Sequence, residues 1–265
     1  MRKPRRLSNE QLAPWVWQLK NLSPQPPPLR REAEPEEETE ACRPLSEAPP
    51  FLGEGLGRGS STPTRLDWAA FFGNANPVEI EVGTGKGLFL LHAATARPVT
   101  NFLGIEIVRK YQLYAATRYA IRNLPNVKTA CADAAVVLRD YVVPGSVAAV
   151  HVYFPDPWWK KRHRKRRVFT PEFAADAARA LAPGGRLLVA SDVEEYFGLM
   201  TAILRAMPAF AERPEEAERA APQTEAGYAT NFERKALAGG GSVWRAAYER
   251  TSEAVAVVAD PELGM

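Results

Sequence analysis

The sequence predicts an α/β protein with one mainly parallel sheet of seven strands, helices on both of its faces and an antiparallel edge at the C-terminal end. Beyond Leu66, apolar runs of strand length alternate with segments of helical periodicity, which is the pattern of strands joined by crossover helices. Glycine and proline close several helical segments, as in Pro183-Gly184-Gly185. A chain of 265 residues, 46% of them hydrophobic, is long enough to bury one core of this kind.

The expected elements follow one another in a regular order. The expected strands are Val78–Val82, Asn101–Ile107, Val127–Cys131, Val147–Phe154 and Arg186–Ala190. The expected helices are Lys86–Ala94, Arg109–Asn123, Ala134–Tyr141, Pro171–Leu181 and Glu194–Met207. After Phe210 the spacing loosens, and we expect the antiparallel edge strands at Val243–Thr251 and Ala254–Ala259.

The first 64 residues differ in composition from the rest. The segment Ser23–Arg58 is rich in Pro, Glu and Gly and contains the acidic run Glu32–Glu40, so it cannot bury enough apolar surface to fold. We therefore expect a largely disordered arm over residues 1–64, with Leu12–Leu19 able to form a short docked helix, and a folded domain over residues 65–265.

The N-terminal residues Met1–Glu10 are basic and polar, with no apolar stretch behind them. We therefore expect neither a signal peptide nor a membrane anchor, and a cytoplasmic protein. The only two cysteines, Cys42 and Cys131, have no zinc-ligand spacing, so we expect no metal site. The sequence leaves open whether the protein is a monomer or a homodimer.

The net charge of +3 conceals one strongly basic segment. Lys160–Arg167 contains seven of the 34 Lys and Arg residues, so the other 27 bases and the 31 acids leave the rest of the chain at −4. A short cluster of this kind is expected where a protein contacts a phosphate backbone. We therefore expect nucleic acid as a partner, although a solvated charged loop is the ordinary alternative for such a run.

A glycine-rich loop follows the first expected strand of the sheet. Val78–Val82 runs directly into glycines at positions 83, 85 and 87, where the carboxyl edge of a parallel sheet opens a ligand crevice. A dinucleotide fingerprint would place another glycine where Leu88 stands. The loop therefore favours S-adenosylmethionine over a nicotinamide cofactor, with Gly83, Gly85 and Gly87 as candidate contacts.

Three acidic residues stand at or beside the ends of three successive strands. Glu81 precedes the glycine loop, where a carboxylate suits the sulfonium and ammonium cations of S-adenosylmethionine. Glu106 is expected to accept hydrogen bonds from both ribose hydroxyls, and Asp133 to lie near the adenine. A helix N-cap is an equally good interpretation of Asp133, because Ala134 begins an expected helix.

The fourth strand ends in Tyr-Phe-Pro-Asp-Pro-Trp-Trp, residues 153–159, and passes straight into the basic segment. The prolines on either side of Asp156 restrict the backbone and are expected to hold its carboxylate at the sheet edge, opposite the glycine loop. Trp158 offers a flat face for a base. The segment suits methylation at guanine N7, because this nitrogen carries an available lone pair and needs no general base. The site must then only orient the purine and stabilise the cation that forms. Asp156 is the leading candidate for both tasks and for a cofactor contact.

This combination of segments resembles the bacterial tRNA (guanine-N7)-methyltransferases, which carry a Phe-Pro-Asp-Pro-Trp stretch followed by a basic run. The resemblance extends from about Asp67 to Arg250. It implies a Rossmann-like class I methyltransferase fold, S-adenosylmethionine as the cofactor, and methylation at N7 of a variable-loop guanosine in tRNA. It implies cofactor contacts at Glu81, Glu106 and Asp133 and catalysis at Asp156. The substrate contacts that it implies are Lys160, Arg162, His163, Arg164, Lys165, Arg166, Arg167, Asp192, Thr230, Asn231, Phe232 and Glu233.

Two parts of the chain depart from this pattern or admit another interpretation. Trp159 stands where the family commonly has a second proline, and the N-terminal arm is longer than the family leads us to expect. Without the resemblance, Asp192 is expected to cap the next helix, because Glu195 completes a capping-box-like pattern.

Three other classes of function compete with this hypothesis. The first is an exocyclic-amino methyltransferase acting on rRNA or DNA, which usually follows its acid with Pro-Pro-aromatic, unlike Pro157-Trp158. The second is a nicotinamide-dependent dehydrogenase. Such an enzyme needs a glycine at position 88 and an acid or base at the hydride site, and this sequence shows neither. The third is an RNA-binding module without catalysis, which would have no need of all the acids.

Overall fold

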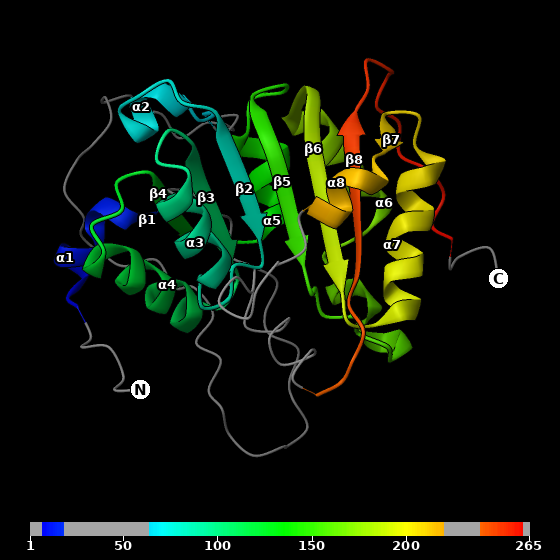
Figure 1. Cartoon of the computed structure of the whole chain (residues 1–265), viewed down its shortest axis with the longest axis horizontal. Coiled ribbons are helices and arrows are strands. Elements are labelled where there is room, and N and C mark those ends of the chain that lie inside the picture. Colours follow the sequence, from blue (N-terminus) through cyan, green and yellow to red (C-terminus); the bar gives the residue numbers. More distant parts are fainter. Residues whose placement is uncertain (1–6, 19–63, 220–238, 262–265) are drawn as a thin grey trace, which may run out of the picture.

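The computed structural model describes residues 7–18, 64–219 and 239–261. Within them, the chain forms a single eight-stranded sheet with the strand order β1-β4-β3-β2-β5-β6-β8-β7 (Figure 1). The strands are β1 (Val16–Trp17), β2 (Val78–Val82), β3 (Asn101–Glu106), β4 (Val127–Cys131), β5 (Val147–Tyr153), β6 (Leu181–Ser191), β7 (Phe210–Glu212) and β8 (Trp244–Arg250). The six strands from β1 to β6 in this order are parallel, and β8 and β7 form the antiparallel edge.

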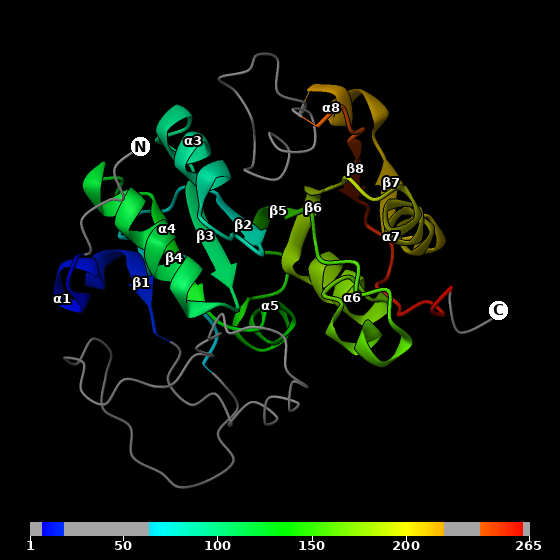
Figure 2. The ribbon, with the colours of Figure 1, turned by 90° about the horizontal axis from the view of Figure 1, so that it is seen from below.

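Helices cover both faces of the sheet. They are α1 (Asn9–Leu12), α2 (Trp68–Phe72), α3 (Leu88–Ala96), α4 (Arg109–Ile121), α5 (Ala134–Val136), α6 (Pro171–Ala180), α7 (Glu194–Ala206) and α8 (Pro214–Arg219). Figure 2 shows α3 on one face and α5 and α6 on the other, and α4 packs against α3. Three short turns of helix join them: η1 (Ala13–Trp15), the π-helical η2 (Val137–Tyr141) and the 3₁₀-helical η3 (Lys161–Arg166).

The core lies between the sheet and its helices. The central strands β2, β3 and β5 are almost wholly buried, because helices cover both of their faces. The larger cluster includes Ile80 and Val150 from the sheet and Phe173 from α6. Around Phe102 and Tyr119 a second cluster packs α3 and α4 onto the other face. The expected α/β class and mainly parallel sheet are therefore confirmed.

The strand order positions the ligand-binding edge. The chain moves outward from β2 through β3 to β4, and then returns to place β5 on the other side of β2. In such sheets ligands bind beside the carboxyl ends of the strands where the direction reverses. In Figure 1 the arrowheads of β2, β5 and β6 all point to the lower edge of the sheet. The glycine loop and the Asp156 segment both leave the sheet there.

The N-terminal residues 7–18 dock on the sheet in a form that differs from the single helix expected over Leu12–Leu19. Ser8 caps α1, in which Leu12 is only 3% exposed, and η1, which contains Pro14, then leads into β1. The Trp15 indole donates to the Leu124 carbonyl at 2.8 Å. The two residues of β1 pair with β4, so β1 is a strand of the sheet that the sequence did not predict.

The C-terminal edge also differs in detail from the expectation. β8 matches the expected strand at Val243–Thr251, but Ala254–Ala259 forms no strand. β8 already pairs with β6 on one side and with β7 on the other, so the residues that follow it cannot pair with it. The short β7 before α8, which the sequence did not indicate, takes the edge position instead.

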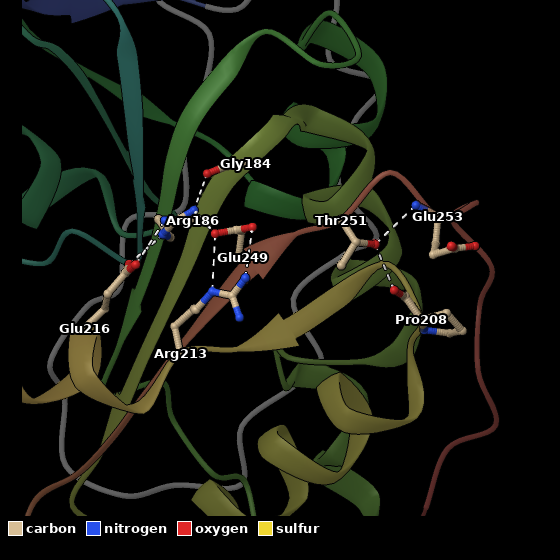
Figure 3. A network of polar contacts seen from close by, with 8 residues as sticks. All are labelled: Gly184, Arg186, Pro208, Arg213, Glu216, Glu249, Thr251 and Glu253. Atoms are coloured by element: carbon tan, nitrogen blue, oxygen red, sulfur yellow. Dashed lines mark hydrogen bonds and ion pairs between the residues drawn. The ribbon is translucent and has the colours of Figure 1, made fainter.

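A network of ion pairs fastens α8 to the sheet (Figure 3). Arg186 of β6 contacts Glu216 of α8 at 2.5 Å and Glu249 of β8 at 2.9 Å. Arg213 contacts the other Glu249 oxygen at 3.1 Å, so this carboxylate joins the chain before α8 to β8. Nearby, Thr251 donates to the Pro208 carbonyl at 2.9 Å and closes the corner after β8.

None of the helices in the part of the chain that the structure describes has both the length and the apolar composition that a membrane crossing needs.

Candidate active site

The loop between β2 and α3 turns through three glycines with positive φ angles, 74° at Gly83, 55° at Gly85 and 68° at Gly87. An added Cβ atom would meet nothing within 4 Å at Gly83, and only a carbonyl oxygen at 3.9 Å at Gly85. At Gly87 it would lie 2.2 Å from the Tyr119 hydroxyl and 2.6 Å from the Ala115 Cβ. The first two glycines therefore leave open space at the sheet edge, whereas the third allows α3 to pack closely against α4.

Glu81 lies beneath this loop and is only 3% exposed. Its Oε2 accepts a hydrogen bond of 2.8 Å from the Thr84 hydroxyl. Burial raises the pKa of Glu81 to about 8 in spite of this bond, and repulsion from Glu106 adds to the effect. A buried carboxyl in this state gains most from a ligand that brings a positive charge.

Glu106 holds the glycine loop from the end of β3. Its two oxygens accept backbone hydrogen bonds from Gly85 at 2.7 Å and from Val108 at 2.8 Å. Burial raises the pKa of Glu106, these backbone bonds oppose the rise, and repulsion from Asp156 supports it. The charge of Asp156 acts on Glu106 because the two predicted acids lie at the same edge of the sheet.

Asp133 follows β4 and acts as the N-cap of α5. Its Oδ1 accepts a hydrogen bond of 2.9 Å from the Ala135 N–H. The capping interpretation of this residue is therefore confirmed. Its place two residues beyond β4, at the carboxyl edge, also agrees with the position expected for a contact with the adenine.

The Asp156 segment has a strained backbone on both sides of the aspartate. Phe154 and Trp158 adopt positive φ angles of 53° and 40°, which are uncommon for bulky side chains. The Phe154 N–H donates to the Ala190 carbonyl of β6 at 2.8 Å, which fixes the point where the chain leaves the sheet. Strain of this kind costs on the order of 1 to 3 kcal/mol per residue and is concentrated at functional sites. Asp156 is exposed, but the surrounding protein partly desolvates its carboxyl group and raises its pKa.

The basic segment Lys160–Arg167, hereafter the basic run, forms the turn of η3. Lys160, Arg162, Arg164, Lys165 and Arg166 are exposed, as a surface for phosphates requires. His163 is half-buried, and its ring meets the Trp158 ring edge-on with the centroids 5.8 Å apart. Desolvation, together with the neighbouring cations Arg166, Arg162 and Lys160, lowers the pKa of His163.

The structure places Arg167 differently from the other members of the basic run. It is only 7% exposed, and its Nε donates to the Pro157 carbonyl at 2.6 Å. Its guanidinium lies 5.6 Å from the Trp159 ring and 5.2 Å from the Tyr196 ring. Arg167 therefore ties the Asp156 segment to α7, instead of facing solvent as a phosphate contact would.

The two tryptophans after Asp156 differ in exposure and in their neighbours. The face of Trp158, expected to receive a base, has the Arg166 guanidinium 5.0 Å from its ring centre. Trp159 is 43% exposed and offers the larger free apolar surface. Which ring is the more exposed depends on the backbone turn at Trp158, where φ is positive, and no local pattern of residues reveals it.

The remaining predicted substrate contacts are Asp192 and the four residues at 230–233. Asp192 follows β6 at the carboxyl edge and is exposed. Its interpretation as a helix cap is wrong, because α7 begins at Glu194 with Val193 at the N-cap and no capping side chain. Thr230, Asn231, Phe232 and Glu233 lie outside the described residues.

Sequence reasoning missed three residues that support the site. Thr84 binds Glu81, Tyr119 donates to the Gly87 carbonyl at 3.2 Å, and Tyr196 stacks with Arg167. Thr84 stood within the glycine loop and offered a local signal. Tyr119 and Tyr196 gave none, because both reach the site from helices that are distant in the sequence.

Comparison with known proteins agrees with this geometry. Residues 75–246 match a family described as putative methyltransferases. The tRNA (guanine-N(7)-)-methyltransferase of Rhodopirellula baltica is 40% identical over 196 residues, which is 72% of each chain. The one from Bordetella pertussis is 41% identical over 191 residues, 71% of this chain and 73% of the relative. The one from Streptomyces coelicolor is 41% identical over 172 residues, 65% of this chain and 63% of the relative. The chain therefore belongs to the tRNA (guanine-N(7)-)-methyltransferase family.

Proposed function

We propose that this protein transfers the methyl group of S-adenosylmethionine to N7 of a guanosine in tRNA, and that the guanosine lies in the variable loop. One observation carries the proposal. Two buried carboxylates, Glu81 and Glu106, lie beneath the open turn at Gly83 and Gly85, beside the strained segment of Asp156, which leads into the exposed basic run. The family to which the chain belongs supports the choice of substrate.

The residues of the site fit S-adenosylmethionine. When bound, this cofactor supplies an electrophilic methyl group on a sulfonium cation. The Glu81 carboxylate is complementary to the positive charge of the cofactor. The open space at Gly83 and Gly85 allows the cofactor to approach the backbone of the loop closely. Glu106 accepts backbone N–H groups of Gly85, Val108 and Ile107, which leaves one of the four lone pairs of the carboxylate for a ribose hydroxyl. Asp133 contributes at the adenine end.

Asp156 orients the guanine at the other side of the site. Its carboxylate accepts hydrogen bonds from the guanine N1–H and N2–H groups, and its negative charge stabilises the cationic purine that results from alkylation at N7. The N7 lone pair attacks without prior deprotonation, so the reaction needs no general base from the protein. The strained turns around Asp156 fix the carboxylate in advance and reduce the reorganisation that the reaction requires.

The exposed part of the basic run binds the phosphates next to the target guanosine. We assign this role to Lys160, Arg162, His163, Arg164, Lys165 and Arg166, with Asp192 and residues 230–233 as further substrate contacts. Arg167 has an internal role instead, because it is buried against Trp159 and Tyr196. We assign all of this chemistry to a catalytic domain that spans residues 65–265.

The proposal is tested by mapping modified nucleosides. Tritiated S-adenosylmethionine, the purified protein and an unmodified tRNA transcript should yield 7-methylguanosine in the variable loop, located by nuclease digestion and mass spectrometry. The matched control is the same transcript with the variable-loop guanosine replaced by adenosine, which should incorporate no methyl group. A methylated exocyclic amine, or equal labelling of both transcripts, would refute the proposal.

A further inference from the structure

We infer that the protein has a second surface for the tRNA phosphate backbone, separate from the basic run and formed by α4 together with the glycine loop. This inference rests on the proposed function, because it takes tRNA as the ligand. We call it the α4 surface, and its members are Lys86, Arg109, Lys110, Arg118 and Arg122.

The α4 surface carries positive charge that the described part of the protein does not neutralise. Residues 107–132 contain four members of this surface together with Lys128 of β4, and no Asp or Glu. Among the described residues, no ion pair connects a member of the α4 surface to a carboxylate. The elements that pack most closely on α4 bring only two acids, Glu10 on α1 and the buried Glu106. A solvated face usually carries both positively and negatively charged side chains. A face with positive side chains alone therefore suits the binding of an anion.

Tyrosines hold two of these cations close together. The Tyr114 ring has the Lys86 Nζ 6.0 Å from its centre and the Arg118 guanidinium 5.0 Å from its centre. Lys86 also lies 5.7 Å from the Tyr111 ring, and Arg118 donates to the Lys86 carbonyl at 3.1 Å. Two like charges on one ring repel each other, and a phosphate between them relieves that repulsion.

The first turn of α4 breaks the usual rule for a helix N-terminus. Arg109 and Lys110 occupy this turn, it holds no acid, and Val108 at the N-cap offers no side-chain hydrogen bond. Cations are unfavourable here, because the helix dipole is positive at its N-terminal end. A sequence that violates a local rule usually does so for function. With an RNA phosphate bound, the same charges and dipole act together.

The topology puts the α4 surface within reach of an RNA that occupies the active site. α4 begins three residues after the end of β3, at the carboxyl edge, and β3 and β5 lie on opposite sides of β2. Adjacent strands are about 4.8 Å apart, so the first turn of α4 and the start of the Asp156 segment are separated across the sheet by roughly 10 Å.

The opposite end of the sheet is unfavourable for RNA. Residues 171–219, which form α6 to α8 with the strands between them, contain nine Asp or Glu and five Lys or Arg. The part of the chain that the structure describes is therefore polarised along the sheet. A tRNA held by the basic run extends across the β2–β3 side of the sheet towards α4, whose exposed charge is positive, and away from α7 and α8.

The test measures binding of an unmodified tRNA transcript at several salt concentrations. The variant K110Q/R122Q removes two exposed charges that touch neither Glu81 nor Asp156. The matched control R139Q/R205Q removes the same net charge from two exposed arginines that are paired with Asp140 and Glu212. We expect K110Q/R122Q to weaken tRNA binding about tenfold and to lower the salt-dependence slope by about 1 to 2, while the control changes little.

Two further measurements keep the outcomes distinct. S-adenosylmethionine affinity and kcat at saturating tRNA should stay at the wild-type level in K110Q/R122Q, and Lys110→Gln alone should lower the slope by about 1. If wild type binds and methylates tRNA but K110Q/R122Q matches R139Q/R205Q, the inference fails and the proposed function stands. If wild type does not bind tRNA, both fail.

Discussion

The Gly85 N–H donates a 2.7 Å hydrogen bond to the carboxylate of Glu106, so the acid that ends β3 also holds the glycine loop that follows β2. The other carboxylate oxygen accepts from Val108, where α4 is about to begin. One side chain thus links three elements of the cofactor site before any ligand arrives. Glu106 therefore supports the shape of the loop, and in the proposed function it also contacts the cofactor.

Glu106→Gln should weaken cofactor binding by roughly 10- to 100-fold, because the amide NH₂ would face a backbone N–H donor and the negative charge that the remaining N–H groups stabilise is lost. Isothermal titration with S-adenosylmethionine measures the effect. Glu172→Gln, an exposed acid in the first turn of α6, is the matched control and should bind as wild type. Equal affinity in both variants would contradict the role assigned to Glu106.

Cofactor binding should release a proton from Glu81. With its pKa raised to about 8, this buried carboxyl is protonated at pH 7 in the free protein, and a cationic ligand favours the ionised form. Affinity should therefore rise as the pH increases towards about 8 and level off above it. Calorimetry in buffers of different ionisation enthalpy measures the released proton. The release should disappear in Glu81→Gln, and a heat that is independent of buffer in the wild type would exclude it.

Asp156→Asn should lower kcat by about 100-fold or more while the cofactor still binds, because the lost charge acts on the cationic purine. Single-turnover methylation of tRNA measures this change. Desolvation raises the pKa of Asp156. As the pH is lowered, wild-type activity should therefore begin to fall at a pH higher than the ordinary aspartate pKa. An Asn variant with wild-type turnover would remove Asp156 from the mechanism.

Gly83→Ala and Gly87→Ala form a matched pair, because both glycines have φ near 70° but differ in what surrounds them. A methyl group at Gly83 meets open space and costs only the left-handed backbone, roughly 1 kcal/mol, or about 2 to 4 °C in Tm. At Gly87 it also overlaps Tyr119 and Ala115, so the loss should reach about 5 to 10 °C. Thermal melts of the two variants compare them directly, and identical Tm values would contradict the packing role of Gly87.

Arg167→Lys should lower kcat by about tenfold with little change in the KM for tRNA, because a lysine cannot keep both the bond to the Pro157 carbonyl and the stacking with Trp159 and Tyr196. Lys165→Gln is the contrasting variant. It is exposed, and its loss should raise KM several-fold and leave kcat unchanged. Steady-state kinetics at fixed salt separates the two effects, and a KM effect in both would show that Arg167 also contacts phosphate.

Much of the sheet and its helices was predictable, because local patterns of residues indicate where these elements begin and end. Buried parallel strands are continuous apolar runs bounded by glycine and proline, so β2 and β4 have the bounds expected for them. The edges were less predictable. β1 and β7 are too short to show periodicity, and the absence of a strand at Ala254–Ala259 depends on which strand edges remain free.

The sequence by itself determined the class of fold, the glycine loop, the acids of the site and the location of the basic run, because each is a pattern of residue types at short spacing. Only the tertiary structure decided how those residues divide their work. It made Gly87 a packing residue, turned Arg167 inward and left Trp159 more exposed than Trp158. Side-chain direction at a strained turn, and contact between elements distant in the sequence, depend on the packed chain, and no local pattern encodes them.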